Sequence, residues 1–168
     1  MDRAPARTGS ACLLERAREL EQIDRLLADA VGRAGRAMLI EGPAGIGKTA
    51  LLEAARQRAG EHGATVLAAR GGELEAHFPF GVVRQLFEPL LHRSSAEARA
   101  QLLAGAAHLA GPVVGARLEA APPGGDLSGP LHGLYWLTVN LASRAPVLIA
   151  VDDAHWAAGR AATAGAGT

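Results

Sequence analysis

Residues 42–49 read Gly-Pro-Ala-Gly-Ile-Gly-Lys-Thr, which matches the pattern G-x-x-x-x-G-K-[ST]. Glycines at positions 42, 45 and 47 let the backbone curl around an anion so that several N–H groups point inward. A helix that starts directly after the stretch would present its partial positive charge to the same place. Lys48 can then extend a compact charge to the β and γ phosphates of a nucleotide, and the Thr49 hydroxyl is placed to coordinate Mg²⁺. The stretch therefore predicts a phosphate-binding loop.

The lysine of this stretch is the only one in the chain, and the other cationic side chains among the 17 lysines and arginines are all arginine. A planar guanidinium would crowd an enclosed backbone nest, whereas an ammonium group is a compact charge on a slender stem. The alternative is a plain glycine-rich turn in a chain with 21 glycines. The segments on either side of the stretch argue against that alternative.

These flanking segments predict the order strand, loop, helix, strand. Residues 37–41 (AMLIE) form a short apolar run bounded by glycines, which is typical of a buried strand. Residues 50–59 are rich in strong helix formers and stop at Gly60, and residues 65–70 (TVLAAR) have the composition of a second strand. A βαβ unit in a parallel sheet is the simplest interpretation, so we expect an α/β fold.

Several other segments have helical character. Apolar residues at helical spacing predict an amphipathic helix over 13–31 and another helix over 78–91, with Pro89 limiting its end. The latter contains Phe80 and Phe87, which with Phe78 are expected in the core.

Two more helices are expected further along the chain. Ser94 and Glu97 form a capping-box pattern ahead of a helix that stops at Gly111-Pro112. After a turn-rich connector at 121–129, residues 131–144 predict a well-buried helix.

Residues 146–153 (PVLIAVDD) form an apolar run closed by two aspartates, as expected of a central parallel strand. Asp152, at the end of that strand, can hold Mg²⁺ opposite the threonine, and Asp153 can orient or deprotonate an attacking water. The alternative is that both aspartates only cap the strand. The following His155-Trp156 pair either packs locally or senses the nucleotide, with local packing the simpler interpretation.

Composition excludes several classes of function. The formal net charge is zero and basic residues are interspersed with acidic ones, so direct nucleic-acid binding is not expected. The histidines lack metal-ligand spacing, and Cys12 has no second cysteine to pair with. No apolar run approaches the length that spans a bilayer, and the N-terminus lacks a signal sequence, so we expect no membrane association and a cytoplasmic location.

The chain resembles the N-terminal ATPase region of large LuxR-family transcriptional regulators, in the STAND branch of AAA-like P-loop NTPases. The resemblance runs from Leu13 to Trp156. It is carried by four stretches in this order: LLERARELEQIDRLL, EGPAGIGKTALLEAAR, ARGGELEAHFPFGVVRQLFEPLL and LHGLYWLTVNLASRAPVLIAVDDAHW.

The resemblance implies a conformational switch driven by Mg²⁺-ATP binding and slow hydrolysis, with ATP and ADP as ligands. The Walker B aspartate matches Asp152, the neighbouring acid matches Asp153, and Glu15-Arg16 lies where the family often contacts the nucleotide base. The nucleotide-binding positions at and directly after Walker A match Gly42, Pro43, Ala44, Gly45, Ile46, Gly47, Lys48, Thr49 and Ala50.

The chain departs from the family pattern after Trp156. We expect a partial ATPase domain at 13–156 between disordered segments at 1–12 and 157–168, without the family's sensor strand, lid, helical repeats or helix-turn-helix. In this superfamily the strand after Walker B lies between the Walker A and Walker B strands. Its absence leaves backbone groups unpaired at a cost of about 1 to 3 kcal/mol each where they are buried. We therefore expect a tendency to collapse, swapping, aggregation or other self-association, and poor nucleotide affinity.

Three functions therefore remain open at this point. The first is an ATP-binding switch module of a transcriptional regulator, with slow or absent hydrolysis and with DNA binding confined to full-length family members. The second is a free-standing P-loop ATPase or small-molecule kinase. A kinase needs an acceptor site and a lid arginine after Walker B, which the last twelve residues hardly provide. The third is an inactive remnant.

Overall fold

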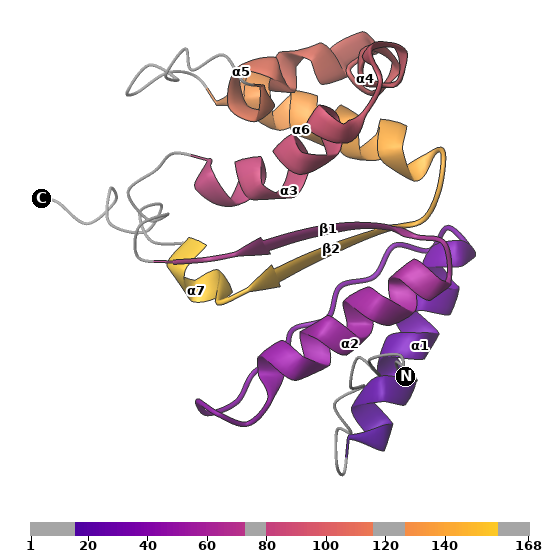
Figure 1. Ribbon diagram of the computed structural model, residues 1–168, viewed down its shortest axis with the longest axis vertical. Coiled ribbons are helices and arrows are strands. Elements are labelled where there is room, and N and C mark those ends of the chain that lie inside the picture. Colours follow the sequence, from indigo (N-terminus) through magenta and orange to yellow (C-terminus); the bar gives the residue numbers. More distant parts are fainter. Residues whose placement is uncertain (1–15, 73–79, 116–126, 158–168) are drawn as a thin grey trace, which may run out of the picture. The chain divides into compact units, whose positions relative to one another are not determined.

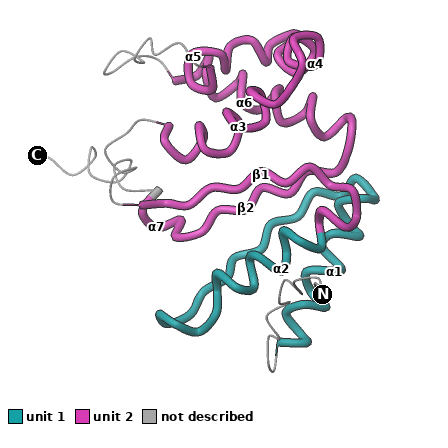
Figure 2. Tube along the Cα trace, in the orientation of Figure 1, with its two compact units in different colours: residues 1–58 teal, residues 59–168 magenta. Residues whose placement is uncertain are grey.

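Helices and one small parallel sheet make up the part of the chain that the computed structural model describes, which is residues 16–72, 80–115 and 127–157 (Figure 1). The chain divides into two compact units, residues 1–58 and residues 59–168 (Figure 2). The combination of helices with a parallel sheet confirms the α/β class.

Unit 1 contains α1 (Ala17–Val31) and most of α2 (Lys48–Glu61), which confirms the two helices expected in this region. α1 is amphipathic and buries Ile23 and Leu27. Arg58 of α2 forms an ion pair with Asp24 of α1, which ties the two helices together.

The predicted strand at 37–41 is wrong. Residues 34–43 form neither helix nor strand, and the side chain of Leu39 is 76% exposed. A strand exists only where a neighbour completes its hydrogen bonds, and no described segment pairs with this one. The expected βαβ unit is therefore not formed around the loop, although the apolar run itself does lead into the loop.

Unit 2 contains the sheet, made of β1 (Thr65–Arg70) and β2 (Val147–Asp152). The two strands are parallel, with Thr65 opposite Val147 at one end and Arg70 opposite Asp152 at the other. Both strands and their parallel pairing confirm the prediction. β2 is not central, however, because within the described residues the sheet has only these two strands.

Helices cover the sheet within unit 2, with α3 (Gly81–Arg93) packed on β1 (Figure 1). They continue with α4 (Ala96–Leu102), the 3₁₀ helix η2 (Gly105–Ala110), α5 (Gly111–Val114) and α6 (Ser128–Ala142). A short helix, α7 (Ala154–Ala157), follows β2.

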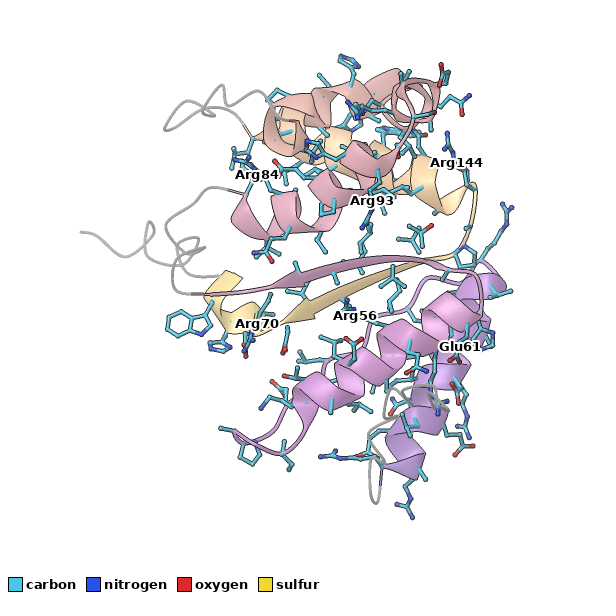
Figure 3. The ribbon with its side chains drawn as sticks, viewed as in Figure 1. Arg56, Glu61, Arg70, Arg84, Arg93 and Arg144 are labelled. Carbon is cyan, nitrogen blue, oxygen red and sulfur yellow. The ribbon has the colours of Figure 1, made fainter. Side chains whose placement is uncertain are left out.

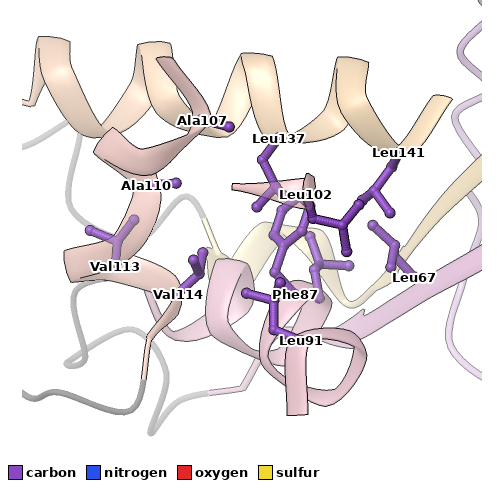
Figure 4. Close-up of a cluster of buried hydrophobic side chains, with 11 residues drawn as sticks. Leu67, Phe87, Leu91, Leu102, Ala107, Ala110, Val113, Val114, Leu137 and Leu141 are labelled. Atoms are coloured by element: carbon purple, nitrogen blue, oxygen red, sulfur yellow. The ribbon is translucent and has the colours of Figure 1, made fainter. Parts of the chain in front are cut away.

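The core of unit 2 forms between the helices and β1 (Figure 4). Phe87 is buried in it, as expected, and Phe80 packs against it partly buried. Its buried members are Leu67, Leu86, Phe87, Leu91, Leu102, Ala107, Ala110, Val113, Val114, Leu137 and Leu141.

Pro89 does not limit α3, contrary to the prediction, because the helix continues through it to Arg93. A proline inside a helix removes one backbone donor and crowds the preceding turn. The turn after Pro89 carries Leu91, which is buried in the core. Burial of that turn outweighs the local preference to stop.

The predicted capping box is displaced by one residue. Ser95, not Ser94, caps α4, and its hydroxyl accepts a hydrogen bond from the Ala98 N–H at 3.2 Å. Ser94 instead closes α3, where its hydroxyl donates to the Leu90 carbonyl at 2.9 Å. Two adjacent serines made either assignment possible from sequence.

The helix expected to run on to Gly111-Pro112 is also wrong, because the chain breaks after α4. Gly105 has φ of 61°, a left-handed conformation that favours glycine and redirects the chain into η2. Pro112 then lies in the first turn of α5, where its missing N–H costs nothing. Glycine and proline act here as turn and start signals rather than as a stop.

α6 confirms a helix near 131–144, but it has two faces rather than one buried surface. Leu137 and Leu141 are buried in the core, whereas Leu131, Tyr135 and Trp136 are exposed. The buried face packs closely on η2: an ideal Cβ placed on Gly133 would lie 2.2 Å from the backbone nitrogen of Ala110. Only a residue without a side chain fits there.

Several predictions concern residues that the structure does not describe. These are the N-terminal segment with Cys12 and Glu15, the side chain of Phe78, much of the connector at 121–129, and residues 158–168 of the C-terminal tail. Among the described residues, no helix is both long enough and apolar enough to cross a membrane.

Candidate functional site

The phosphate-loop candidate lies in unit 1, where it joins residues 34–43 to α2. Gly45 has φ of 80° and Gly47 has φ of 90°, so both lie in the left-handed region where a side chain would be strained. The chain turns at residues 44–47 and enters the helix at Lys48. The glycines at 45 and 47 are therefore needed for the shape of the loop.

Lys48 folds back across the loop. Its Nζ donates to the carbonyl oxygen of Gly42 at 2.8 Å and to that of Pro43 at 3.0 Å. Hydrogen bonds from a charged donor are stronger than neutral ones, so these two contacts hold the ammonium group at the loop. The third donor of the ammonium group is not used by these two bonds and suits a phosphate oxygen.

The first turn of α2 belongs to the same candidate phosphate site as the loop. The first helical hydrogen bond of α2 runs from the Leu51 N–H to the Gly47 carbonyl at 3.0 Å, so Lys48, Thr49 and Ala50 form the start of the helix. Backbone N–H groups at a helix start favour an anion, because the helix dipole is positive there. Thr49 is exposed at this position, where its hydroxyl is an oxygen ligand of the kind Mg²⁺ prefers.

Arg16 is brought to the same loop, which sequence spacing alone did not require. Its Nη2 donates to the Ile46 carbonyl at 2.6 Å, and its Nη1 contacts Glu19 Oε1 at 2.7 Å. A hydrogen bond from the backbone of Glu19, and then the bond from Arg16, lower the pKa of the Glu19 carboxyl. Arg16 thus contacts the backbone of the loop itself, and its proposed contact with the base stays a prediction.

The acidic pair lies in unit 2, at the carboxyl end of the sheet. Asp152 ends β2, and its Oδ1 accepts a hydrogen bond from the Asp153 N–H at 3.0 Å. Asp153 has φ of 50°, a left-handed conformation that aspartate tolerates better than most residues. The backbone therefore turns sharply at Asp153, so the carboxylates of Asp152 and Asp153 lie in different surroundings.

Arg70 ends β1 and is labelled in Figure 3. Its side chain forms an ion pair with Asp153. Both Nε and Nη2 of Arg70 lie 3.0 Å from Asp153 Oδ2, which leaves Oδ1 outside the ion pair. The backbone of Arg70 is fixed in turn by Gln85 of α3, whose side chain accepts from the Arg70 N–H at 3.0 Å and donates to its carbonyl at 3.1 Å.

Sequence reasoning missed both Arg70 and Gln85. The signal for Arg70 was available: it ends the strand TVLAAR, just as Asp152 ends VLIAVD, and parallel strands end at the same edge of a sheet. Gln85 had no signal, because its contact depends on how α3 packs on β1.

His155 and Trp156 lie in α7 directly after the acidic pair. Their ring centroids are 5.3 Å apart, and both side chains are exposed. Local packing between the two rings is present, while a role in nucleotide sensing stays a prediction. No group of three or more His, Cys, Asp or Glu side chains that could hold a metal ion occurs within residues 16–72, 80–115 and 127–157.

The residues present fit a nucleotide with Mg²⁺. In unit 1 the loop offers left-handed glycines, a fixed ammonium group and a helix start, which suit phosphate, and Thr49 offers a hydroxyl oxygen. In unit 2 Asp152 offers carboxylate oxygens. Mg²⁺ in nucleotide sites is held by one or two protein side chains together with phosphates and waters, so ligands of this kind suit it.

Comparison with known proteins agrees with this chemistry. A family model described as the AAA ATPase domain matches residues 13–164. Searches of curated proteins and of solved structures found no match. The matched region contains the phosphate loop, the parallel strands and the acidic pair, and the architecture is that of an incomplete P-loop NTPase fold. The chain belongs to the family of AAA ATPase domains.

Proposed function

We propose that this chain is the ATP-binding switch module of a LuxR-type transcriptional regulator of the STAND class. Residues 13–156 form the ATPase region in this proposal. The chain binds Mg²⁺-ATP and Mg²⁺-ADP, and hydrolysis is slow or absent. DNA binding belongs to other parts of full-length family members.

The observation that carries the proposal is the position of Lys48. Its ammonium group is held by the Gly42 and Pro43 carbonyls at the start of α2, and Lys48 is the only lysine in a chain whose other cationic side chains are all arginine. A chain that uses arginine for its other cationic positions keeps lysine where a compact charge in a backbone nest is needed. This supports a phosphate ligand rather than a structural ion pair.

Each residue has a defined role in the proposal. The backbone of Gly42 to Gly47 and the start of α2 bind the phosphate oxygens, and Lys48 neutralises the β and γ phosphates. Mg²⁺, when bound, screens the phosphate charge. Thr49 and Asp152 supply its protein ligands, and Asp153 orients the attacking water through the oxygen that Arg70 does not contact.

Calorimetric titration with Mg²⁺-ATP and Mg²⁺-ADP tests the proposal. The wild-type chain is expected to bind both, and Lys48→Ala should weaken binding at least about tenfold, because a charged hydrogen-bonding partner is lost. Lys48→Arg is the more specific variant, because it keeps the positive charge. It should still weaken binding, since the planar guanidinium group does not fit the enclosed backbone loop. Asp152→Ala should weaken binding only when Mg²⁺ is present.

The same titration separates the alternatives. If the wild-type chain does not bind ATP at millimolar concentration, the proposal is wrong and an inactive remnant is favoured. Rapid turnover that depends on an added acceptor molecule would favour a small-molecule kinase. Arg25→Ala is the matched control, because Arg25 pairs with Glu21 on the exposed face of α1. This variant should bind nucleotide like the wild type.

A further inference from the structure

Arg16 connects the beginning of α1 to the phosphate loop across thirty positions of sequence. It is the N-cap residue of α1, but its side chain makes no capping hydrogen bond. The side chain of Arg16 is 25% exposed, and its guanidinium group is held between two acceptors, Glu19 and the Ile46 carbonyl. The side chain therefore joins Glu19 of α1 to the backbone of the loop.

The contacted carbonyl belongs to the peptide that joins Ile46 to Gly47. This peptide lies between Gly45 at φ 80° and Gly47 at φ 90°, which are the two most permissive positions of the loop. In a trans peptide the C=O and the following N–H lie in one plane and point in opposite directions. Holding the Ile46 oxygen toward Arg16 therefore fixes the Gly47 N–H in the opposite direction.

We propose that Arg16 is a positioning residue for phosphate binding. It anchors the Ile46–Gly47 peptide so that the Gly47 N–H is presented to the phosphate, and Glu19 orients the guanidinium group for this contact. The inference rests on the proposed function, because it requires that the loop bind phosphate. It differs from a contact with the nucleotide base, because it concerns the two nitrogen atoms of Arg16 that already bond Glu19 and the Ile46 carbonyl.

Pyrophosphate separates the two roles, because it has neither a base nor a ribose. The test measures the Kd of pyrophosphate and of ADP, both with Mg²⁺, for the wild type and for Arg16→Ala, Arg16→Lys, Glu19→Gln and Arg25→Ala. Arg16→Ala should raise both Kd values by the same factor, about three- to tenfold for a charged hydrogen bond at a partly exposed position. Arg16→Lys keeps a charged donor and should recover part of the loss, and Arg25→Ala should change neither Kd.

A Kd for pyrophosphate that is the same in the wild type and in Arg16→Ala, with only ADP weakened, would overturn the inference in favour of a base contact. If Arg16→Ala does not fold, Arg16→Lys and Glu19→Gln replace it in the test. A pyrophosphate Kd equal to that of the wild type in both variants would also overturn the inference.

A wild type that binds neither ligand would overturn the proposed function instead. The backbone amide signal of Gly47 in the ligand-free chain, observed by NMR, keeps the two failures apart. Arg16→Ala should shift this signal and speed its hydrogen exchange, whereas Arg25→Ala should not. A signal that Arg16→Ala leaves unchanged contradicts the anchor whether or not the chain binds phosphate.

Discussion

Arg70 and Asp153 form an ion pair at the carboxyl end of the sheet, with Nε and Nη2 of the arginine both 3.0 Å from the same carboxylate oxygen, Oδ2. The pair joins the residue that ends β1 to the residue that follows β2. It therefore closes the sheet at the end where both strands stop, and it leaves one carboxylate oxygen of Asp153 outside the pair.

The pair is expected to contribute little to stability. The side chain of Arg70 is 71% exposed and that of Asp153 is 31% exposed, and ion pairs in such surroundings are worth about 0.2 to 1 kcal/mol. Arg70→Ala should lower the free energy of unfolding, measured with urea, by no more than about 1 kcal/mol. The loss should shrink as salt is added, because salt screens exposed charges.

A double-mutant cycle with Asp153→Asn isolates the pair. The two single substitutions should lose more in sum than the double variant loses. Additive effects would mean that the side chains of Arg70 and Asp153 do not stabilise one another in solution.

The backbone conformation of Asp153 carries a separate prediction. Its φ of 50° is strained for most residues with a side chain but not for glycine. Asp153→Ala and Asp153→Gly both remove the carboxylate, so their difference reports the backbone. The glycine variant should be more stable than the alanine variant by about 1 kcal/mol in urea unfolding. Equal stabilities, or a more stable alanine variant, would show that this turn relaxes without strain.

Much of the fold could be predicted from sequence because local patterns decide it. The run TVLAAR became β1 with the same bounds, and LLEAARQRA lies inside α2, because composition agrees with the tertiary structure there. The predicted stop of this helix at Gly60 is wrong by one residue, since α2 continues through Gly60 to Glu61. Predictions failed where packing competes with local preference. Pro89 lies inside α3 because the next turn is buried, and residues 37–41 form no strand because an apolar run needs a partner.

The candidate site also has parts that could be predicted from sequence and parts that could not. The loop at 42–49 was recognisable because its chemistry is contained in consecutive residues. The contacts of Arg16 with Ile46 and of Gln85 with Arg70 join residues 30 and 15 positions apart, and no local pattern encodes them. Side chains that support a site from a distance in sequence are therefore the part that required a structure.

Acid should weaken the start of α4 through Glu97. A hydrogen bond from the backbone of Glu97, and then the bond from Ser95, lower the pKa of this carboxyl below its ordinary value of 4.5. The ionised form is thus favoured in the folded chain, and its contribution to stability is complete above pH 4.5 and is lost as the pH falls through the lowered pKa. The difference in unfolding free energy between the wild type and Glu97→Gln should shrink as the solution is acidified through this range.

Ser95→Ala provides the comparison for this titration, since it removes both the bond to Glu97 and the cap on the Ala98 N–H. It should cost about 1 kcal/mol at neutral pH through the lost cap and should reduce the effect of Glu97→Gln. A difference between wild type and Glu97→Gln that stays constant with pH would mean that the carboxyl makes no special contact in the folded chain.

Gly133 should be the least tolerant glycine of α6. A Cβ at this position would lie 2.2 Å from the nitrogen of Ala110 and 2.6 Å from the carbonyl carbon of Leu109, and both are backbone atoms that cannot move aside alone. Gly133→Ala must push η2 away from α6 and open the core around Leu137, so it should lower the free energy of unfolding by at least about 3 kcal/mol. Gly129→Ala is the comparison: it lies in the same helix, has no atom beyond its chain neighbours within 4 Å of its Cβ, and should cost no more than about 1 kcal/mol, through the strain of a side chain before Pro130. Urea unfolding of both variants measures the contrast, and similar stabilities would show that α6 and η2 do not pack this closely in solution.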